Sequence, residues 1–269
     1  MQSSRTTPLW SSRSLDEAYL DVTDHLKSGA TAWATAKDIR KRIHDETELT
    51  ASAGISYNKF LAKLASDQQK PNGQFAIMPD EGEAFVASLP VAKFHGVGRV
   101  TTAKMHALGI ETGADLRRQT LDFLRNHFGK SGNWYYELAR GQDNRPVQPD
   151  RERKSSGAET TFAEDLTDPA GIEAGVIAMA DEVWSWCEKA KSRGRTVTVK
   201  IKWADFQIST RRRSLETTIE TRDRLREVAL DLIRSVLPPI KGIRLVGVTV
   251  SNFRPQKAGE GAELPFREV

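Results

Sequence analysis

Cysteine is almost absent from this sequence. Only Cys187 occurs among 269 residues, so no disulfide bond can form within the chain. It falls on the apolar stripe of a predicted helix, where we expect a packed thiol and not a reactive one. No apolar run is long enough to cross a bilayer, and the first ten residues lack the hydrophobic core of a signal peptide. We therefore expect a cytoplasmic protein with no membrane span.

Several common signatures of enzymes are also missing. The five histidines do not show the paired spacing of metal ligands. No GxxxxGK[ST] loop occurs, and Thr101 stands where a GxGxxG dinucleotide fingerprint needs its last glycine. The sequence therefore offers no histidine metal pair, no P-loop and no Rossmann fingerprint.

Basic residues slightly outnumber acidic ones. The chain has 40 Lys and Arg against 36 Asp and Glu, a net charge of +4 and an isoelectric point near 9.1. Clusters of Lys and Arg favour a polyanionic partner, although composition alone does not distinguish nucleic acid from a membrane surface. The length allows two or three compact units.

Residues 1–78 combine strand and helix patterns. We predict strands over 14–22, 50–56 and 74–78, and helices over 30–49 and 58–69. Asn58 is a suitable N-cap for the second helix, and the turn from Lys70 to Gly73 follows it. This region is interpreted as a mixed α/β layer.

Residues 79–144 show no strand pattern. Short helical segments are separated there by glycines, which favours a small helical unit. The next segment, 145–154, has two prolines, many charges and almost nothing to bury. That composition predicts an extended linker.

The order of predicted elements over 155–255 is β-α-β-β-α-β. Asp168 and Pro169 supply an N-cap and a first-turn proline to the first helix, and both helices carry an apolar stripe. In this split βαβ arrangement, both helices cover one sheet face and the other face is open. Residues 256–269 follow as a flexible tail. The predicted fold class of the whole chain is α+β.

The open face of this sheet is expected to be basic. Alternation over 196–203 places the apolar residues against the helices and Lys200 and Lys202 on the other face. In the next strand, Arg211 and Arg213 have the phase opposite to the apolar residues. We therefore expect these four cations on one surface.

Two features of the first region could carry chemistry. Asp16 and Glu17 are adjacent, and strand neighbours point to opposite faces, so both reach one metal ion only at a strand end or turn. Solvated surface acids are the commoner explanation of such a pair. Lys70 lies in a tight turn that suits a phosphate, although an exposed turn lysine is again commoner.

The segment VAKFHGVGRVTTAKMHALGI carries the third feature. Gly96, Val97 and Gly98 form a glycine hairpin between two short helices, with Arg99 and Lys104 beside it. Exposed backbone N–H groups and a helix N-terminus suit a phosphate, so this helix-hairpin-helix pattern grips a nucleic-acid backbone without reading bases. An ordinary turn between two helices is the alternative.

Together these segments resemble the Y family of translesion DNA polymerases, of the DNA polymerase IV type, from Thr7 to about Phe253. SLDEAYLDVT, ASAGISYNKFLAKLASDQQKPNGQF, the GVG hairpin with ALGIET, and KSSGAETTFAEDL occur in the family's order. The resemblance implies a partial palm domain over 1–78, a thumb over 79–144 and a DNA-binding little finger over 155–255.

The resemblance also implies roles for individual residues. Asp16 and Glu17 would be catalytic ligands of two Mg²⁺ ions, and Lys70 would contact the incoming deoxynucleoside triphosphate. Primed duplex DNA would be the partner. The residues expected to contact it are Gly96, Val97, Gly98, Arg99, Lys104, Lys154, Ser155, Lys200, Arg211 and Arg213.

One departure from the family concerns the start of the chain. Family members begin with a strand that bears an Asp in a DMDCFF-like motif, followed by a fingers domain. Neither precedes Asp16 here, and WSSR at 10–13 replaces the usual lead-in. We therefore expect an N-terminally truncated polymerase that binds primed DNA and extends it negligibly, because one metal-bridging carboxylate is missing.

Three further interpretations remain. The tail segment from Glu263 to Phe266 faintly resembles the peptides with which bacterial polymerases bind the sliding clamp. A non-catalytic Y-family scaffold is the nearest alternative function, and Asp16, Glu17 and Lys70 count against it. An RNA-binding module is more distant, because the closely spaced aromatic residues of an RNP pattern are not found.

Overall fold

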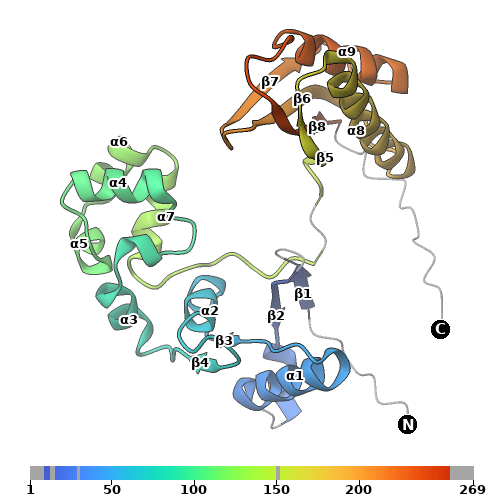
Figure 1. Ribbon diagram of the computed structural model, residues 1–269. Coiled ribbons are helices and arrows are strands. Elements are labelled where there is room, and N and C mark those ends of the chain that lie inside the picture. Colours follow the sequence, from blue (N-terminus) through green and yellow to red (C-terminus); the bar gives the residue numbers. More distant parts are fainter. Residues whose placement is uncertain (1–8, 13–15, 29–30, 150–151, 255–269) are drawn as a thin grey trace. The chain divides into compact units, whose positions relative to one another are not determined.

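The computed structural model describes residues 9–12, 16–28, 31–149 and 152–254 (Figure 1). The chain divides into two compact units, Met1–Arg151 and Glu152–Val269, within the segment predicted as a linker. No helix in the described ranges is both long and apolar enough to cross a membrane.

The first unit begins with short strands. β1 (Leu9–Ser12) pairs antiparallel with β2 (Ala18–Asp21), and the 3₁₀ helix η1 (Thr23–Ser28) follows. The strand expected over 14–22 is therefore shorter, and its partner β1 was not predicted. α1 (Ala32–Thr47) begins at the N-cap Thr31, and its apolar residues Ala32, Ala36, Ile39 and Ile43 are only half-buried.

A parallel strand pair and a connecting helix come next. β3 (Ala53–Ile55) pairs with β4 (Gln74–Ala76), and α2 (Lys59–Ser66) joins them. The predicted N-cap is confirmed, since the side chain of Asn58 accepts a hydrogen bond from Leu61 N at 2.9 Å. β3 and α2 pack very closely at Gly54, where an added Cβ would lie 1.9 Å from the carbonyl oxygen of Ala62. Only glycine fits there.

The rest of the first unit is helical, as predicted. Its elements are α3 (Gly82–Ser88), the 3₁₀ helix η2 (Val91–Lys93), α4 (Arg99–Ala107), α5 (Gly113–Arg118), α6 (Leu121–Phe128) and α7 (Ser131–Leu138). Phe60 and Leu61 of α2 belong to the same buried cluster as residues of these helices, including Met105 and Leu138. One core therefore joins α2 to the helical region.

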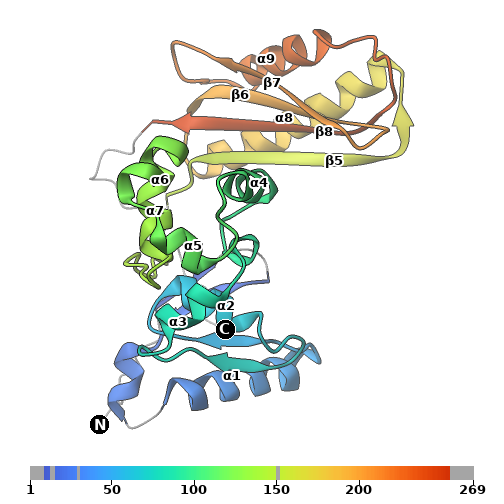
Figure 2. The same ribbon diagram turned by 90° about the vertical axis from the view of Figure 1, so that its left-hand side faces the viewer.

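The second unit confirms the β-α-β-β-α-β order (Figure 2). The elements are β5 (Ser155–Leu166), α8 (Pro169–Lys189), β6 (Gly194–Trp203), β7 (Ile208–Ser214), α9 (Arg222–Arg234) and β8 (Ile243–Phe253). They form an antiparallel sheet in the order β5-β8-β6-β7.

Both helices of the second unit pack on the same sheet face. Val197, Val199 and Ile201 of β6 are fully buried with the apolar stripes of α8 and α9, and the predicted thiol packing is confirmed because Cys187 is buried in this cluster. Two ion pairs tie the helices together, Arg226 with Asp181 at 2.6 Å and Arg234 with Glu173 at 2.7 Å. Neither helix of the second unit lies on the opposite face of the sheet.

The prediction that Arg211 and Arg213 lie on the open face of the sheet is wrong. Arg211 pairs with Val199 and Arg213 with Val197, and directly paired residues of antiparallel strands share a face. Both arginines therefore lie on the helix side of the edge strand β7, where Arg213 forms a 3.0 Å ion pair with Asp231 of α9.

The prediction failed because apolar character was used to set the phase of β7. Ile208 is 58% exposed and pairs with Lys202 on the open face, and Phe206 is 59% exposed with its ring 4.7 Å from Lys202 Nζ. At the edge of the sheet these apolar residues are not in the core. Arg212, which pairs with Thr198, is the arginine of β7 on the open face.

Candidate functional site

Asp16 and Glu17 lie just before β2, not within it. Asp16 is exposed and Glu17 is half-buried. This is the strand-end position at which neighbouring carboxylates are able to turn toward one site, because the alternation of a regular strand has not begun. The short β2 thus removes the geometric objection to a shared metal site.

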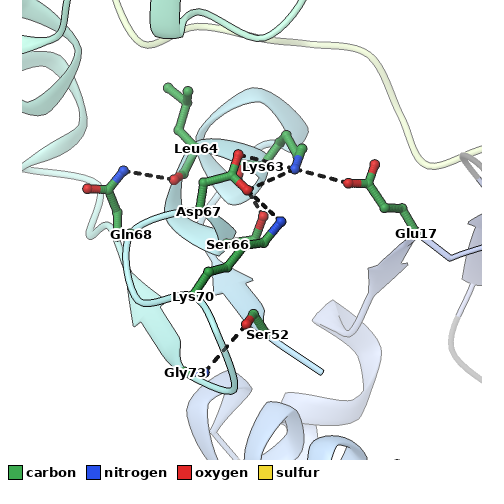
Figure 3. A network of polar contacts seen from close by, with 9 residues as sticks. All are labelled: Glu17, Ser52, Lys63, Leu64, Ser66, Asp67, Gln68, Lys70 and Gly73. Carbon is green, nitrogen blue, oxygen red and sulfur yellow. Dashed lines mark hydrogen bonds and ion pairs between the residues drawn. The ribbon is translucent and has the colours of Figure 1, made fainter. Parts of the chain in front are cut away.

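A row of alternating charges extends from Glu17 to Lys70 (Figure 3). Glu17 Oε1 lies 3.1 Å from Lys63 Nζ, which lies 3.1 Å from Asp67 Oδ1. The same Asp67 oxygen lies 2.7 Å from Lys70 Nζ. Lys63 of α2 and Asp67 at the C-terminal end of α2 therefore connect Glu17 to Lys70. We call these four residues the charge row.

The ion pairs of the charge row favour the charged forms of its two central members, Lys63 and Asp67. Burial opposes the charge of Lys63, but hydrogen bonds to Glu17 and Asp67 outweigh it and raise the pKa of Lys63. Burial likewise opposes the charge of Asp67, yet its hydrogen bonds to Lys70 and Lys63 lower the pKa of Asp67. Lys63 is the least accessible member, with its side chain 14% exposed. Lys63 is the central cation of the row, because it lies between Glu17 and Asp67 and pairs with both.

The turn after α2 presents Lys70 to solvent. Its side chain is 50% exposed, and Asp67 is its ion-pair partner. The turn is fastened by Arg40 of α1, whose guanidinium donates to Asn72 Oδ1 at 2.8 Å, and by the Gly73 N–H, which lies 3.4 Å from Ser52 Oγ. An ammonium group on a supported turn is able to exchange a carboxylate partner for a phosphate.

The importance of Lys63 and Asp67 was missed in the sequence. They are four residues apart, and Lys70 follows Asp67 by three, which is the spacing of side-chain neighbours on a helix. Charge patterning along 63–70 could have found that pair of contacts. The contact of Lys63 with Glu17 joins distant segments and has no local signal.

The acidic pair fits a divalent metal ion in part. Mg²⁺ is commonly bound by one or two carboxylates together with substrate phosphates and water. Asp16 and Glu17 offer two carboxylates at one strand end, and Lys70 lies at the other end of the charge row. Among the described residues, no cluster of three or more His, Cys, Asp or Glu side chains is arranged for a metal. The donor set therefore suits an ion that also takes ligands from a substrate.

The glycine hairpin has the form expected for a phosphate site. Gly96, Gly98 and Arg99 are exposed, whereas Val97 points inward and is 8% exposed. Gly98 is the N-cap of α4 and offers no side-chain acceptor to the first N–H groups of the helix. Those groups and the helix dipole therefore favour an anion at this end.

Lys104, within α4, contacts α6. Its ammonium group donates to the carbonyl oxygen of His127 and lies 5.2 Å from the centre of the Phe128 ring. Both contacts are with α6, so Lys104 joins two helices in this structure.

The open face of the second unit brings together several expected DNA contacts. Lys200 lies there and forms a 2.7 Å ion pair with Glu159 of β5. Ser155, the first residue of β5, has the same phase, and the preceding Lys154 is exposed. Lys202 and Arg212 share this face, and Arg211 and Arg213 do not. The segment from Glu263 to Phe266 lies outside the described residues.

Three family matches cover most of the chain. The impB/mucB/samB family matches residues 2–67, and the C-terminal domain of the same family matches residues 153–262. Between them, residues 92–143 match the thumb domain of DNA polymerase-iota. The third match contains the glycine hairpin.

Curated relatives and solved structures agree with these matches. The chain is 58% identical to DNA polymerase IV 3 of Mesorhizobium japonicum, over 94% of this chain and 70% of that protein. It is 51% identical to DNA polymerase IV 2 of Agrobacterium fabrum, over 94% and 71%. A Y-family DNA polymerase chimera of Dbh and Dpo4 has a TM-score of 0.76 at 27% identity, over 90% of this chain and 70% of that one. An insertion ternary complex of Dbh DNA polymerase has a TM-score of 0.54 at 26% identity, over 87% and 68%.

Proposed function

Because the chain belongs to the Y-family DNA polymerases of the DNA polymerase IV type, we propose that it serves translesion synthesis by transferring nucleotides to a primer 3′-hydroxyl. It is by family a metal-dependent nucleotidyltransferase. The observation that carries the assignment of a site is the charge row, which links Glu17, just before β2, to Lys70.

Asp16 and Glu17 are the proposed metal ligands, and Mg²⁺ is the proposed ion. Bound metal would neutralise charge on the triphosphate and lower the pKa of the primer hydroxyl. The role of the chain's own residues is to place the carboxylates. Lys63 fixes one oxygen of Glu17 by an ion pair.

Lys70 is proposed to bind the triphosphate of the incoming nucleotide. Asp67 pairs with the ammonium group and holds it in place until the nucleotide arrives. A triphosphate carries more charge than a carboxylate, so it competes effectively for a half-exposed lysine. Asp67 is then left with Lys63, with which it is already paired.

Primed duplex DNA is the proposed macromolecular substrate. The hairpin at Gly96–Arg99 would take a backbone phosphate through N–H groups, and the open face of the second unit would take others through Lys154, Ser155, Lys200, Lys202 and Arg212. Contacts of this kind are independent of base sequence and depend strongly on salt.

We also propose that the C-terminal tail binds a sliding clamp through the segment from Glu263 to Phe266. Deleting residues 256–269 should abolish clamp binding and leave DNA binding by the rest of the chain unchanged. Clamp binding that survives the deletion would contradict this part of the proposal.

A second candidate function is a DNA-bound scaffold without catalysis. It is favoured by the metal donor set, because the described residues provide two adjacent carboxylates and no cluster of three acidic or metal-binding side chains.

Primer extension and DNA binding measured side by side test the proposal. The 269-residue chain is incubated with a primed template, Mg²⁺ and nucleotides, beside Asp16→Asn, Glu17→Gln and Lys70→Ala variants. For a polymerase, any incorporation is abolished by the two carboxylate variants while DNA affinity stays unchanged, and Lys70→Ala raises the KM for nucleotide. Incorporation that survives both carboxylate variants would overturn the site. Tight DNA binding with no incorporation by the unsubstituted chain would favour the scaffold.

A further inference from the structure

The ring of Trp134, on α7, lies against the glycine hairpin. An added Cβ on Gly96 would lie 2.2 Å from Trp134 Cη2 and 3.1 Å from Cζ3. Gly96 has φ +94, a conformation in which residues with a side chain are strained. Two properties of glycine, the left-handed conformation and the missing side chain, thus allow the indole ring to reach the hairpin backbone.

Arg145 approaches the same indole ring. Its guanidinium carbon lies 5.6 Å from the centre of the Trp134 ring, within the range of a cation–π interaction. Asp143 holds Arg145 with two hydrogen bonds, from Nε at 2.6 Å and from Nη2 at 2.8 Å. The side chain of Asp143 is 1% exposed. The arginine is therefore oriented by a buried carboxylate and not by solvent.

The backbone around Arg145 is fixed as well. Asn58 Nδ2 donates to the carbonyl oxygen of Gly141 at 2.7 Å, and Lys59 Nζ donates to that of Pro146 at 2.7 Å. Both donors belong to the N-terminal end of α2. The segment that carries Asp143 and Arg145 is thus anchored on both sides.

Trp134 acts through its aromatic ring and not through its N–H group. The indole Nε1 is buried, and it has no hydrogen-bond partner among the described residues. A buried donor without a partner reduces stability. What Trp134 contributes here is therefore the contacts of its aromatic ring.

We propose that Trp134 is a positioning residue for the hairpin. Held by the Asp143–Arg145 pair, its ring supports the Gly96 backbone from within and fixes the direction in which the hairpin and the start of α4 present their N–H groups. The ligand so served is a phosphate of the nucleic-acid backbone. This inference rests on the proposed role of the hairpin in binding DNA.

Four variants separate this role from simple packing. Trp134→Phe keeps an aromatic ring and removes the buried N–H, and Trp134→Leu keeps apolar volume only. Arg145→Ala removes the cation. Gly96→Ala disrupts the same contact from the side of the hairpin, because the added methyl group would overlap the Trp134 ring. Each is compared with the unsubstituted chain for binding of primed duplex DNA over a range of salt, at a temperature where circular dichroism shows all five proteins folded.

We expect Trp134→Leu and Arg145→Ala to weaken binding several-fold and to lower the slope of log affinity against log salt by about one, the value for one lost phosphate contact. Trp134→Phe should bind like the unsubstituted chain. Normal affinity and salt slope in Trp134→Leu and Arg145→Ala, with a loss in Gly96→Ala, would overturn the inference alone. Normal binding in Gly96→Ala as well would contradict the proposed role of the hairpin.

Discussion

Glu17 Oε1 lies 3.1 Å from Lys63 Nζ, so one ion pair joins the start of β2 to the C-terminal half of α2. Through Lys63 and Asp67, the contact connects Glu17 to Lys70 in the turn. It also gives the central lysine of the site two acidic partners, Glu17 and Asp67.

Replacing Lys63 with Met should destabilise the first unit by about 1–2 kcal/mol, because a nearly buried cation is removed and two carboxylates face each other. Met retains most of the apolar stem, so lost packing contributes little. Lys41→Met is the matched control: its ion pair with Asp45 has side chains 71% and 51% exposed, and such exposed pairs contribute little to stability. Urea unfolding measures both. An equal loss of unfolding free energy in the two variants would mean that Lys63 in the charge row stabilises the protein no more than an exposed ion pair does.

Arg212 and Arg213 provide an adjacent pair on opposite faces of β7. Arg212→Ala should weaken binding of duplex DNA and lower its salt slope by about one, because a cation leaves the open face. Arg213→Ala removes an ion pair with Asp231 on the helix side, so it should leave DNA binding unchanged. Fluorescence anisotropy over a salt series distinguishes them. A larger loss from Arg213→Ala would contradict the assignment of the open face as the DNA surface.

Asp143 should make stability depend on pH. Burial opposes its ionisation, but Arg145 outweighs burial and holds the pKa of Asp143 below its ordinary value of about 3.9. Because the folded pKa is depressed, its stabilisation is complete above that ordinary value and is lost as pH falls through the folded pKa.

Asp143→Asn should therefore lower stability near neutral pH and reduce the loss of stability on acidification. Urea unfolding at a series of pH values from neutral to strongly acidic measures this. A variant whose stability falls in parallel with that of the unsubstituted chain would show that Asp143 does not contribute to the pH dependence.

Asn58 combines two tasks in one side chain. Its Oδ1 caps α2 at Leu61 N, and its Nδ2 donates to the carbonyl of Gly141. Asn58→Ala should cost about 2 kcal/mol, since the loss of a cap typically costs about 1 kcal/mol and the buried carbonyl loses a donor. Asn58→Asp keeps the cap alone and should cost less. An equal loss of thermal stability in both variants would show that the cap contributes little.

The sequence was sufficient where local chemistry decides the structure. The N-caps Asn58 and Asp168 begin helices as predicted, because a short polar side chain at that position meets the first free N–H groups. The β-α-β-β-α-β order was also predicted, since β6 alternates strictly and both helices have apolar stripes. These features depend on residues close together in the chain.

Contacts between distant segments could not be predicted in the same way. The pairing of β6 with β7 determines which side Arg211 faces, and the apolar residues Phe206 and Ile208 gave the wrong phase because they are exposed at an edge. The ion pair between Glu17 and Lys63 and the approach of Trp134 to Gly96 likewise depend on tertiary packing. The periodicity of side chains within one segment contains no information about its contacts with a distant segment.

The shared core of α2 and the helical region has a consequence for how the protein melts. Removing either part would expose Phe60, Leu61 and their partners to water, so neither should remain ordered without the other. The second unit has a separate core around Val199 and Ile201. Calorimetry should accordingly record two cooperative unfolding transitions. Limited proteolysis should cleave α2 and the helices around the hairpin at the same stage of unfolding, because the two share one core.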